Sequence, residues 1–364
     1  MDFTPTEEQA AARDLAARIF GDLATPERLT AAGTGSDPEL WKALSAAGLV
    51  GAVEELGLLG LVLLLEEQGR STAQVPFAST CVYGLLAVAA HGSAEQRERL
   101  LPGIGDGSVV VCGAFPAQGG VRASARGELS GTVPVVPWLR DATHVLVADD
   151  RRRLWLTPVA DGTHIEAVEL TAPWSAGRLT LDGAAAERLG ATDAHFGDEV
   201  QQPPSYSSSP YTDVLATART AFAGLQAGVC AGSLARAVAH TNTREQFGRL
   251  LATRQAVQLR AADAHMDIEA IRVTAYEAAW RRDAGLPYAT HALTAAWWAS
   301  EAGTRVVHTG QHLHGGAGAD LDHPVHRHFL WGRQLDAYLG CGGEVLQELG
   351  ELIVNEDSEE NEKS

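Results

Sequence analysis

The chain has 364 residues, of which 45% are hydrophobic and 20% charged, a composition typical of a globular protein long enough for more than one domain. Its formal net charge of −18 disfavours attraction to the polyanionic backbone of a nucleic acid, so nucleic-acid binding is not expected. The four cysteines form no CxxC pair and the N-terminus has no basic-then-apolar signal pattern, which indicates a reducing cytoplasm. No membrane span is expected, because the apolar run Leu56–Leu65 is shorter than the roughly 20 residues that a bilayer requires.

Residues 1–107 have a helical pattern. Thr6 can cap a helix that begins with Glu-Glu-Gln, and the pair Asp37-Pro38 is a typical helix start. A further apolar helix is predicted over Leu58–Glu67. The segment is therefore predicted to form an all-helical N-terminal domain.

Residues 108–200 differ from those before them in their pattern of apolar and turn residues. Short β-rich runs alternate here with Gly, Pro and Asp turns: VVVCGAF, HVLVADD, RLWLTPV and GRLTLDG. They predict a middle β domain, a barrel or a sandwich. The polar run Gln201–Pro210, rich in Pro and Ser, is interpreted as the connection to the next domain.

Residues 201–354 return to long helical patterns, which favour a C-terminal four-helix bundle. One predicted helix carries small and apolar residues at three- and four-residue spacing: Val257, Ala261, Ala264, Ile268, Ile271, Ala275 and Ala278. The last helix, Phe329–Val354, is interrupted by glycines near Gly340. Residues 355–364 are acidic and lack apolar side chains, so a disordered tail is predicted. The fold class is α+β, with three domains.

Two local motifs in the C-terminal part carry chemistry. The first is Arg-Glu-Gln-Phe-Gly-Arg, from Arg244 to Arg249, followed by Arg254-Gln255; the second is His-Leu-His-Gly-Gly-Ala-Gly, from His312 to Gly318. An arginine offers a planar, permanently charged donor fork that suits a phosphate. Paired glycines let backbone N–H groups approach an anion closely. Each motif alone is weak, but their order and spacing strengthen each other.

Together these motifs resemble those of the acyl-CoA dehydrogenase family, and the likeness extends over nearly the whole chain. The resemblance implies that they reach across a subunit interface to the pyrophosphate and adenosine of a neighbour's FAD. The residues implied in cofactor binding are Arg244, Phe247, Arg254, Gln255, His312, Gly315 and Gly316. One position departs from the family: His312 stands where the family usually has Gln, and Gln311 is one step earlier.

The catalytic base of this family has no counterpart in this chain. A carboxylate must remove the α-proton of the acyl thioester. In one branch of the family it lies on the final helix, where Leu339 stands here; in another it precedes an arginine on the first helix of the bundle, where Ala218 stands before Arg219. Neither side chain accepts a proton, so no catalytic residue is assigned.

The flavin-facing groups of the middle domain are also missing. The family's Thr-Glu-Pro-x-x-Gly-Ser-Asp loop is replaced by Ala114–Val121, which has neither the hydroxyls nor the acid. The family's Trp-Ile-Thr strand aligns with Val135-Val136-Pro137, and proline has no hydroxyl and no backbone N–H. The chain is expected to hold an isoalloxazine of its own poorly.

This pattern predicts a subunit that completes the FAD site of a homologous partner carrying the catalytic Glu. It resembles the non-catalytic subunit of the heterotetrameric acyl-CoA dehydrogenases of actinobacterial steroid side-chain catabolism, particularly over 318–334. The likeness implies an acyl-CoA substrate, a steroid side-chain ester in cholesterol degradation, and an electron-transferring flavoprotein as electron acceptor. Two alternatives stay open: a structural or regulatory subunit with relic clamp residues, and a self-sufficient homo-oligomeric dehydrogenase using Glu344.

A cluster of six histidines raises the question of a metal site. They are His308, His312, His314, His323, His326 and His328. Nearby carboxylates are few, no cysteine joins the cluster, and no HExxH motif is present. Packing and polar contacts around the glycine turn are favoured, and no metal ligand is assigned.

Overall fold

The computed structural model describes residues 2–117, 119–190 and 209–363, and side chains as far as Val354. The chain forms two compact units. The first contains the described parts of 1–26, 58–73 and 219–364, and the second those of 27–57 and 74–218. The predicted connection 201–210 lies almost wholly outside the described residues, and the predicted domain boundaries stay predictions.

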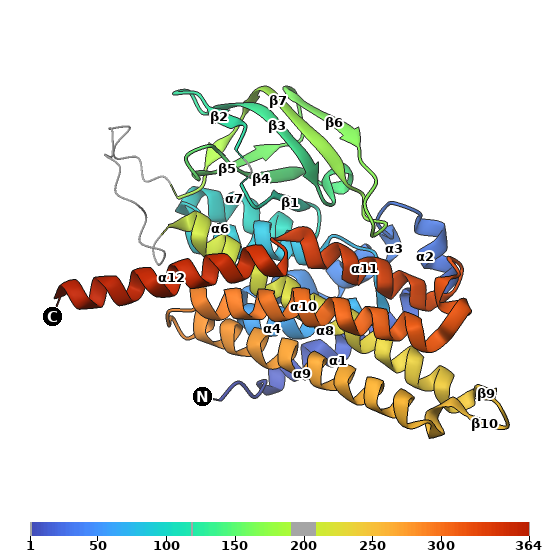
Figure 1. Ribbon diagram of the computed structural model, residues 1–364. Coiled ribbons are helices and arrows are strands. Elements are labelled where there is room, and N and C mark those ends of the chain that lie inside the picture. Colours follow the sequence, from blue (N-terminus) through green and yellow to red (C-terminus); the bar gives the residue numbers. More distant parts are fainter. Residues whose placement is uncertain (1, 118, 191–208, 364) are drawn as a thin grey trace. The chain divides into compact units, whose positions relative to one another are not determined.

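Figure 1 labels most of the helices and strands. The helices are α1 (Glu7–Leu23), α2 (Pro26–Ala32), α3 (Pro38–Ala46), α4 (Leu49–Ser71), α5 (Phe77–Ser79), the π-helix η1 (Thr80–Leu86), α6 (Ala87–His91), α7 (Ala94–Gly105), α8 (Pro210–Thr243), α9 (Gln255–Asp283), α10 (Ala289–His314), α11 (Pro324–Tyr338) and α12 (Gly342–Lys363). The strands are β1 (Val111–Ala114), β2 (Val121–Ala123), β3 (Glu128–Val136), β4 (His144–Ala148), β5 (Leu154–Pro158), β6 (Thr163–Ala167), β7 (Gly177–Ala185), β8 (Glu187–Arg188), β9 (Glu245–Gln246) and β10 (Arg249–Leu250). Short 3-10 turns are η2 (Leu139–Asp141), η3 (Leu251–Thr253) and η4 (Gly315–Ala319).

The two predicted helix starts are confirmed. The Thr6 hydroxyl accepts a hydrogen bond from the Gln9 N–H, and the Gln9 side chain accepts one from the Thr6 N–H, which completes a capping box. In the second unit, the Asp37 carboxylate accepts from the N–H groups of Glu39 and Leu40. Each cap satisfies backbone donors that the first turn of a helix leaves without partners.

The helix predicted at Leu58–Glu67 is part of the longer α4, which bends at Gly57. Gly57 has φ +73°, a conformation that L-residues rarely adopt, so the backbone restarts a helix at Leu58. The Asp283 carboxylate, from the end of α9, accepts hydrogen bonds from the N–H groups of Leu58 (2.8 Å) and Leu59 (2.9 Å). A side chain distant in sequence therefore caps the second part of α4.

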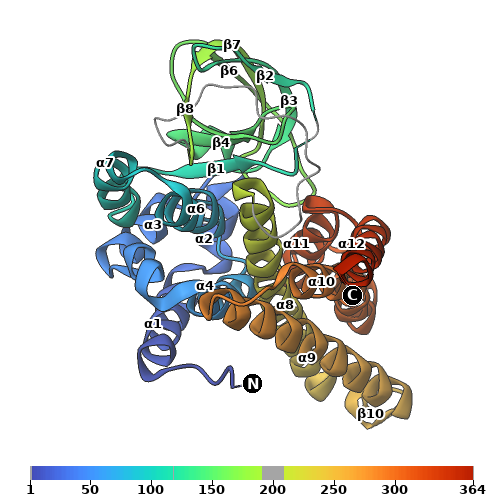
Figure 2. The ribbon, with the colours of Figure 1, turned by 90° about the vertical axis from the view of Figure 1, so that its left-hand side faces the viewer.

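The predicted β region forms two four-stranded sheets in the second unit, with strand orders β1-β4-β5-β8 and β2-β3-β7-β6. Figure 2 shows the two sheets facing one another. All the pairings in these sheets are antiparallel except β1 with β4, which run parallel. The four β-rich runs identified in the sequence correspond to β1, β4, β5 and β7. The predicted fold class, helices before and after a middle β region, is confirmed.

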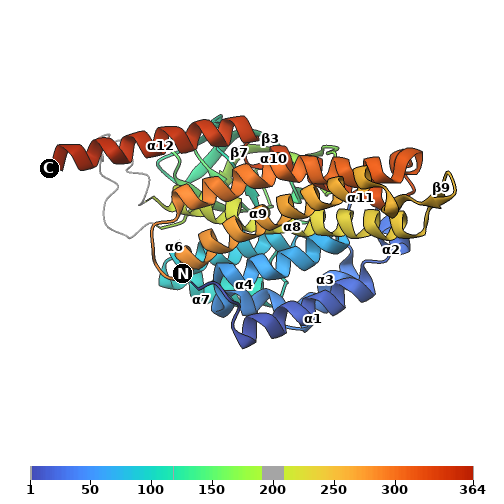
Figure 3. The same cartoon turned by 60° about the horizontal axis from the view of Figure 1, so that its bottom comes forward.

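The helices of the first unit pack closely, and Figure 3 shows α8, α9 and α10 side by side. Of the predicted stripe on α9, five residues are buried, while Val257 and Ala261 at its start are half-buried: the five are Ala264, Ile268, Ile271, Ala275 and Ala278. Glycine permits the contact of α4 with α8, because a Cβ on Gly69 would lie 2.2 Å from the carbonyl oxygen of Leu225. The bundle core thus depends on small residues.

The predicted glycine interruption near the C-terminus separates α11 from α12. Gly340 has φ +107°, and the helix ends before it and restarts at Gly342. The acidic segment from residue 355 differs from the predicted disordered tail, because its backbone continues α12 as far as Lys363. Glu and Lys are good helix formers, and a helix already begun needs no new nucleus to be extended.

Helix α8 is long and apolar enough to cross a membrane by length and composition. In the structure, however, 78% of its apolar window is buried. The apolar run Leu58–Leu65 in α4 is buried as well, and its leucine and valine residues are at most 5% exposed. Both segments are core helices of the fold.

Candidate functional site

The segment after α8 is a tight β-hairpin, built from β9 and β10. Gln246 pairs with Arg249 and Glu245 with Leu250, so Phe247 and Gly248 form a two-residue turn. Their φ values are +55° and +75°, and positive φ at both turn residues defines a type I′ turn. Glycine adopts this conformation freely, but phenylalanine does so at a cost of about 1 to 2 kcal/mol.

Phe247 stands at the tip of this hairpin with 90% of its surface exposed. The guanidinium of Arg254 lies over its ring, 5.3 Å from the centroid, and donates a hydrogen bond to the Gln246 carbonyl at 2.8 Å. Gln255, the next residue, begins α9 and is exposed. Apart from this contact, a strained and exposed aromatic residue contributes little to the isolated fold, which indicates a contact surface.

Arg244 lies at the base of the hairpin. Its N–H donates to the His240 carbonyl at 2.9 Å, and its own carbonyl accepts from Leu251, so the backbone is held from both sides. Its side chain is exposed and has no hydrogen-bond or ion-pair partner among the residues that the structure describes. An exposed guanidinium on a backbone held in this way, with no counter-ion among the described residues, is suited to bind an anion.

The glycine motif forms the C-terminal end of α10. Gly315 has φ +62°, and no heavy atom outside the chain neighbours lies within 4 Å of a Cβ built on Gly315 or on Gly316. Gly318 is different, because a Cβ there would lie 2.3 Å from the Gln311 carbonyl oxygen. The motif therefore combines an open, accessible backbone turn with a tightly packed base.

Gln311 and His312 lie next to each other near the end of α10, and His312 is the residue predicted at the position of the family's glutamine. Gln311 is half-buried and donates through its side-chain amide to the Gly318 carbonyl at 3.1 Å, so it holds the turn from inside. His312 is exposed. The shift by one residue thus leaves a histidine, in place of an amide, at the accessible position.

The two motifs meet at the same end of the first unit. His240, one turn before Arg244 on α8, stacks on His314 at the end of α10, with ring centroids 4.7 Å apart. The ring of His314 also packs edge-on against the ring of His323, with centroids 4.8 Å apart. The hairpin and the glycine turn are therefore neighbours in space, as a shared binding site requires.

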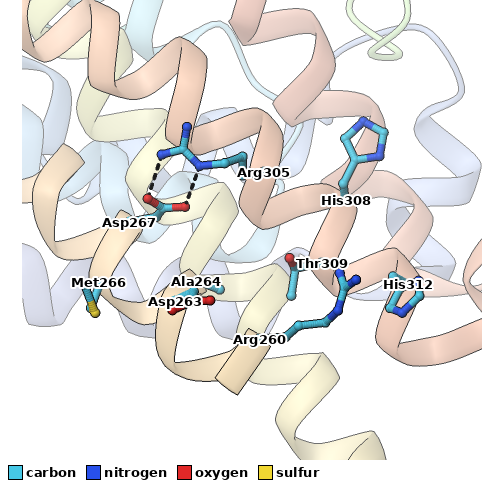
Figure 4. A pocket seen from close by; sticks show the side chains of 9 residues that line it. All are labelled: Arg260, Asp263, Ala264, Met266, Asp267, Arg305, His308, Thr309 and His312. Atoms are coloured by element: carbon cyan, nitrogen blue, oxygen red, sulfur yellow. Dashed lines mark hydrogen bonds and ion pairs between the residues drawn. The ribbon is translucent and has the colours of Figure 1, made fainter. Parts of the chain in front are cut away.

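A groove of about 810 Å³ lies between α9 and α10 (Figure 4), and His312 is the only one of the seven proposed cofactor-binding residues among its lining residues. Arg305 and Asp267 close one part of it with hydrogen bonds of 2.7 and 3.0 Å, while Arg260 extends toward Thr309 and His312 at the other. Both charge signs line the groove, which is typical of a polar contact surface rather than of an apolar ligand pocket.

The segment around Leu339, predicted from the sequence to align with the catalytic base of one branch of the family, forms structural contacts. Leu339 is 6% exposed, and its carbonyl accepts a hydrogen bond from Arg219 at 3.3 Å. Arg219 also forms a two-point ion pair with Glu348, at 2.7 and 2.8 Å. Glu344 is exposed and accepts the Cys341 N–H at 3.1 Å, so its carboxylate caps the start of α12. These contacts give Glu344 a structural role.

The loop after β1 in the second unit is likewise occupied by packing. Phe115 is 6% exposed and stacks between Tyr83 and Tyr211, with centroid distances of 5.2 and 5.5 Å. The Ala117 N–H donates to the Tyr211 hydroxyl at 3.0 Å. This backbone donor is thus already used, and Ala114–Val121 contains no hydroxyl or carboxyl group for a flavin ring.

The histidine cluster has no geometry for a metal in the part of the chain that the structure describes, where no three His, Cys, Asp or Glu side chains are placed to hold an ion. His328 is 1% exposed and contacts the Arg70 and Pro324 carbonyls; burial lowers its pKa to about 4. His308 packs edge-on against Phe329. Helix packing accounts for these two rings.

Comparison with known proteins connects both helical regions to one family. Residues 6–108 match the N-terminal domain of acyl-CoA dehydrogenases, and residues 211–348 match the C-terminal domain. Acyl-CoA dehydrogenase FadE27 of Mycobacterium tuberculosis is 33% identical, over 97% of this chain and 99% of its own length. FadE28 of the same organism is 28% identical over 96% of this chain.

Solved structures agree with this result. A variant of the Tcur3481-Tcur3483 steroid ACAD is 41% identical and superposes with a TM-score of 0.88, covering 97% of this chain and 99% of that one. The ChsE4-ChsE5 complex from Mycobacterium tuberculosis is 31% identical with a TM-score of 0.87, over the same shares. Butyryl-CoA dehydrogenase from Megasphaera elsdenii, at 21% identity and a TM-score of 0.81, shares the fold.

Proposed function

Because this chain belongs to the acyl-CoA dehydrogenase family, we propose that it is a subunit that completes the FAD site of a homologous partner without supplying the catalytic base. FAD is the cofactor of this family and supplies the hydride acceptor for α,β-dehydrogenation of an acyl-CoA thioester. The proposal rests on one observation: the hairpin and the glycine turn lie next to each other at one end of the first unit. Arg244 has no counter-ion among the described residues, Phe247 is exposed, and Gly315-Gly316 is open.

The residues of this end fit one part of FAD, its diphosphate and adenosine. The Arg244 guanidinium would bind a phosphate oxygen, and the N–H groups of the open glycine turn would face the same anion. The ring of Phe247, held by Arg254, would cover an apolar part of the cofactor or of the partner around it. These groups bind and orient; none of them transfers a proton.

The opposite half of the site does not fit in this chain. The loop after β1 offers no hydroxyl or carboxyl group, and the positions of the base hold Leu339 and Ala218. A partner chain would therefore supply both the isoalloxazine contacts and the Glu. Such a chain would be a homologue, because only a homologue presents the complementary half of the same site.

The heterotetramer and the substrate are proposed from the relatives. Two solved relatives above 30% identity are described by their names as a steroid ACAD and as a two-component complex. We therefore propose an unlike partner and a steroid side-chain CoA ester as substrate. An electron-transferring flavoprotein is the proposed electron acceptor, as expected for the family.

Removing the Arg244 guanidinium tests the shared site. In the complex co-purified with its partner, Arg244→Ala is expected to weaken FAD binding by about tenfold to a hundredfold, because one charge-assisted contact to a phosphate is lost. The FAD affinity of the Arg244→Lys variant should lie between those of the wild type and Arg244→Ala, since lysine keeps the charge but lacks the planar fork. The measurement is flavin absorbance per complex after dilution and gel filtration.

The matched control is Arg18→Ala, which removes an exposed arginine from α1 and should leave the flavin content unchanged. If Arg244→Ala also keeps its flavin, the clamp residues are relics and the chain is a structural or regulatory subunit. If the chain alone carries flavin and oxidises an acyl-CoA, it is self-sufficient.

A further inference from the structure

The outward side of α9 carries an apolar stripe. Its three large members are Leu259, Met266 and Val273, which lie seven residues apart and are 56%, 68% and 48% exposed. The exposed Ala262 and the half-buried Ala270 lie between them on the same side of the helix. The buried stripe of α9, described above, lies on the opposite side. A surface helix of a monomer normally has one apolar side, whereas α9 has two, one buried within the first unit and one exposed.

Met266 stands at the middle of this outward stripe. The chain has two methionines, and the other is Met1, so methionine is rare here and is placed where it is exposed. Its unbranched thioether side chain adapts to an irregular neighbouring surface, and methionine is enriched at protein interfaces. A seven-residue spacing of apolar residues is the repeat with which two helices pack along one another. The stripe therefore indicates a second helix packed on α9 in the assembled protein.

The groove between α9 and α10 lies beside the stripe, and Met266 belongs to both (Figure 4). Arg260 and Asp263 also line this groove; both are exposed, and neither has an ion-pair partner among the described residues. A groove that offers unpaired charges of both signs disfavours a purely anionic ligand such as a nucleotide. It fits a protein surface, on which charges of both signs can find complementary partners.

The position of His312 indicates which protein covers this face. His312 is proposed to reach the partner's FAD, and it lines the same groove as Met266. A partner that brings its FAD to His312 therefore also covers the adjoining part of α9. A homologous chain presents an equivalent pair of helices, so the stripe of each chain can pack into the groove of the other.

We propose that the outward stripe of α9 and the groove beside it bind the equivalent helix of the homologous, unlike partner, with Met266 at the centre of the contact. The inference rests on the proposed function and names the surface that holds the partner. Of the residues of this surface, only His312 belongs to the two cofactor motifs, so assembly and FAD binding can be tested separately.

Met266→Glu is expected to weaken the complex by about thirtyfold or more, because it places a charge at the centre of an apolar contact. The measurement is the fraction of co-purified complex that stays assembled on dilution, determined by mass photometry. Met266→Leu keeps an apolar side chain of similar volume and should assemble as the wild type does. Leu346→Glu is the matched control, since it places the same charge on a leucine of α12 that is 52% exposed, and it should leave assembly unchanged.

A photoreactive residue identifies the occupant without a disruptive change. His265 is an exposed neighbour of Met266 on α9, and p-benzoylphenylalanine in its place should crosslink to the partner chain when the intact complex is irradiated. The same residue in place of Leu346 should give no crosslink to the partner. The masses of the crosslinked species distinguish the partner from a second copy of this chain.

Three results would overturn the proposal: normal assembly of Met266→Glu, equal dissociation by Leu346→Glu, or a crosslink from position 265 to a second copy or to no chain at all. The proposed function fails in a different way, because Arg244→Ala would then leave the flavin content of the complex unchanged. If Arg244→Ala loses flavin while Met266→Glu assembles normally, only the docking surface on α9 is wrong.

Discussion

Arg272→Ala is expected to lower the free energy of unfolding by about 3 kcal/mol, the largest stability effect of any single substitution proposed for this chain. Arg272 of α9 donates from Nε to both carboxylate oxygens of Glu66 on α4, at 3.0 and 3.3 Å. Glu66 is 4% exposed, and Tyr276 is its other hydrogen-bonding partner. Burial raises the pKa of Glu66, so even with its partners the carboxylate is held at a cost. Without Arg272 the buried carboxylate would lose its main counter-charge and would keep only the Tyr276 hydrogen bond and the more distant Arg70.

Denaturant unfolding measures the change in unfolding free energy. Two further variants test whether the loss of the Glu66–Arg272 pair causes it. Glu269→Ala removes the exposed second partner of Arg272 and should cost less than about 1 kcal/mol. The double change Glu66→Leu with Arg272→Met should recover most of the loss, because apolar residues of similar size avoid the desolvation of both charges. A single Arg272→Ala variant as stable as the wild type would show that the pair contributes nothing.

Phe247→Gly is expected to separate stability from cofactor binding. Glycine adopts the left-handed turn without strain, so the unfolding free energy should change by no more than about 1 kcal/mol, relief of strain opposing loss of the Arg254 contact. In the complex, however, loss of an exposed aromatic anchor should weaken FAD retention by about thirtyfold. Unfolding curves and flavin content of the same preparations give both quantities.

Phe247→Tyr is the matched control, since it keeps the ring and the strained backbone and should keep the flavin. If Phe247→Gly retains FAD as well as the wild type does, the hairpin tip has no part in the site. If instead it unfolds several kcal/mol more easily, the ring supports the fold and its exposure has been misinterpreted.

The sequence predicted those parts of the structure that depend on local chemistry. Thr6 and Asp37 cap helices because a short oxygen-bearing side chain at this position reaches the first free N–H groups, whatever the rest of the fold. The α9 stripe follows from helical periodicity alone, and the β runs follow from their own local composition and turn residues. The order of helices, strands and helices therefore required no knowledge of long-range contacts.

Contacts between distant segments could not be predicted from the sequence. Nothing near Leu58 indicates that Asp283, more than two hundred residues away, caps its helix. His240 belongs to no motif, and only the packing of α8 against α10 brings it onto His314. The residue types alone could have suggested this contact. One histidine lies four residues before Arg244, the glycine motif contains others, and all of them can bind the same kinds of ligand.

The candidate site was predictable as two motifs but not as one place. Sequence order put Arg244 and Gly315 about seventy residues apart, and the fold of the first unit brings their segments together through the His240–His314 contact. The left-handed conformation of Phe247 had no sequence signal either, because only the following glycine is typical of such a turn. The exposed, strained tip is therefore a finding of the structure.

Flavin absorbance per chain, measured on this protein expressed alone and with its homologous partner, tests the central claim most directly. The shared-site account predicts a colourless or insoluble single chain and a yellow complex that oxidises an acyl-CoA. A single chain that binds FAD and oxidises the thioester without a partner would contradict it, because Leu339 and Ala218 would then not mark a missing base.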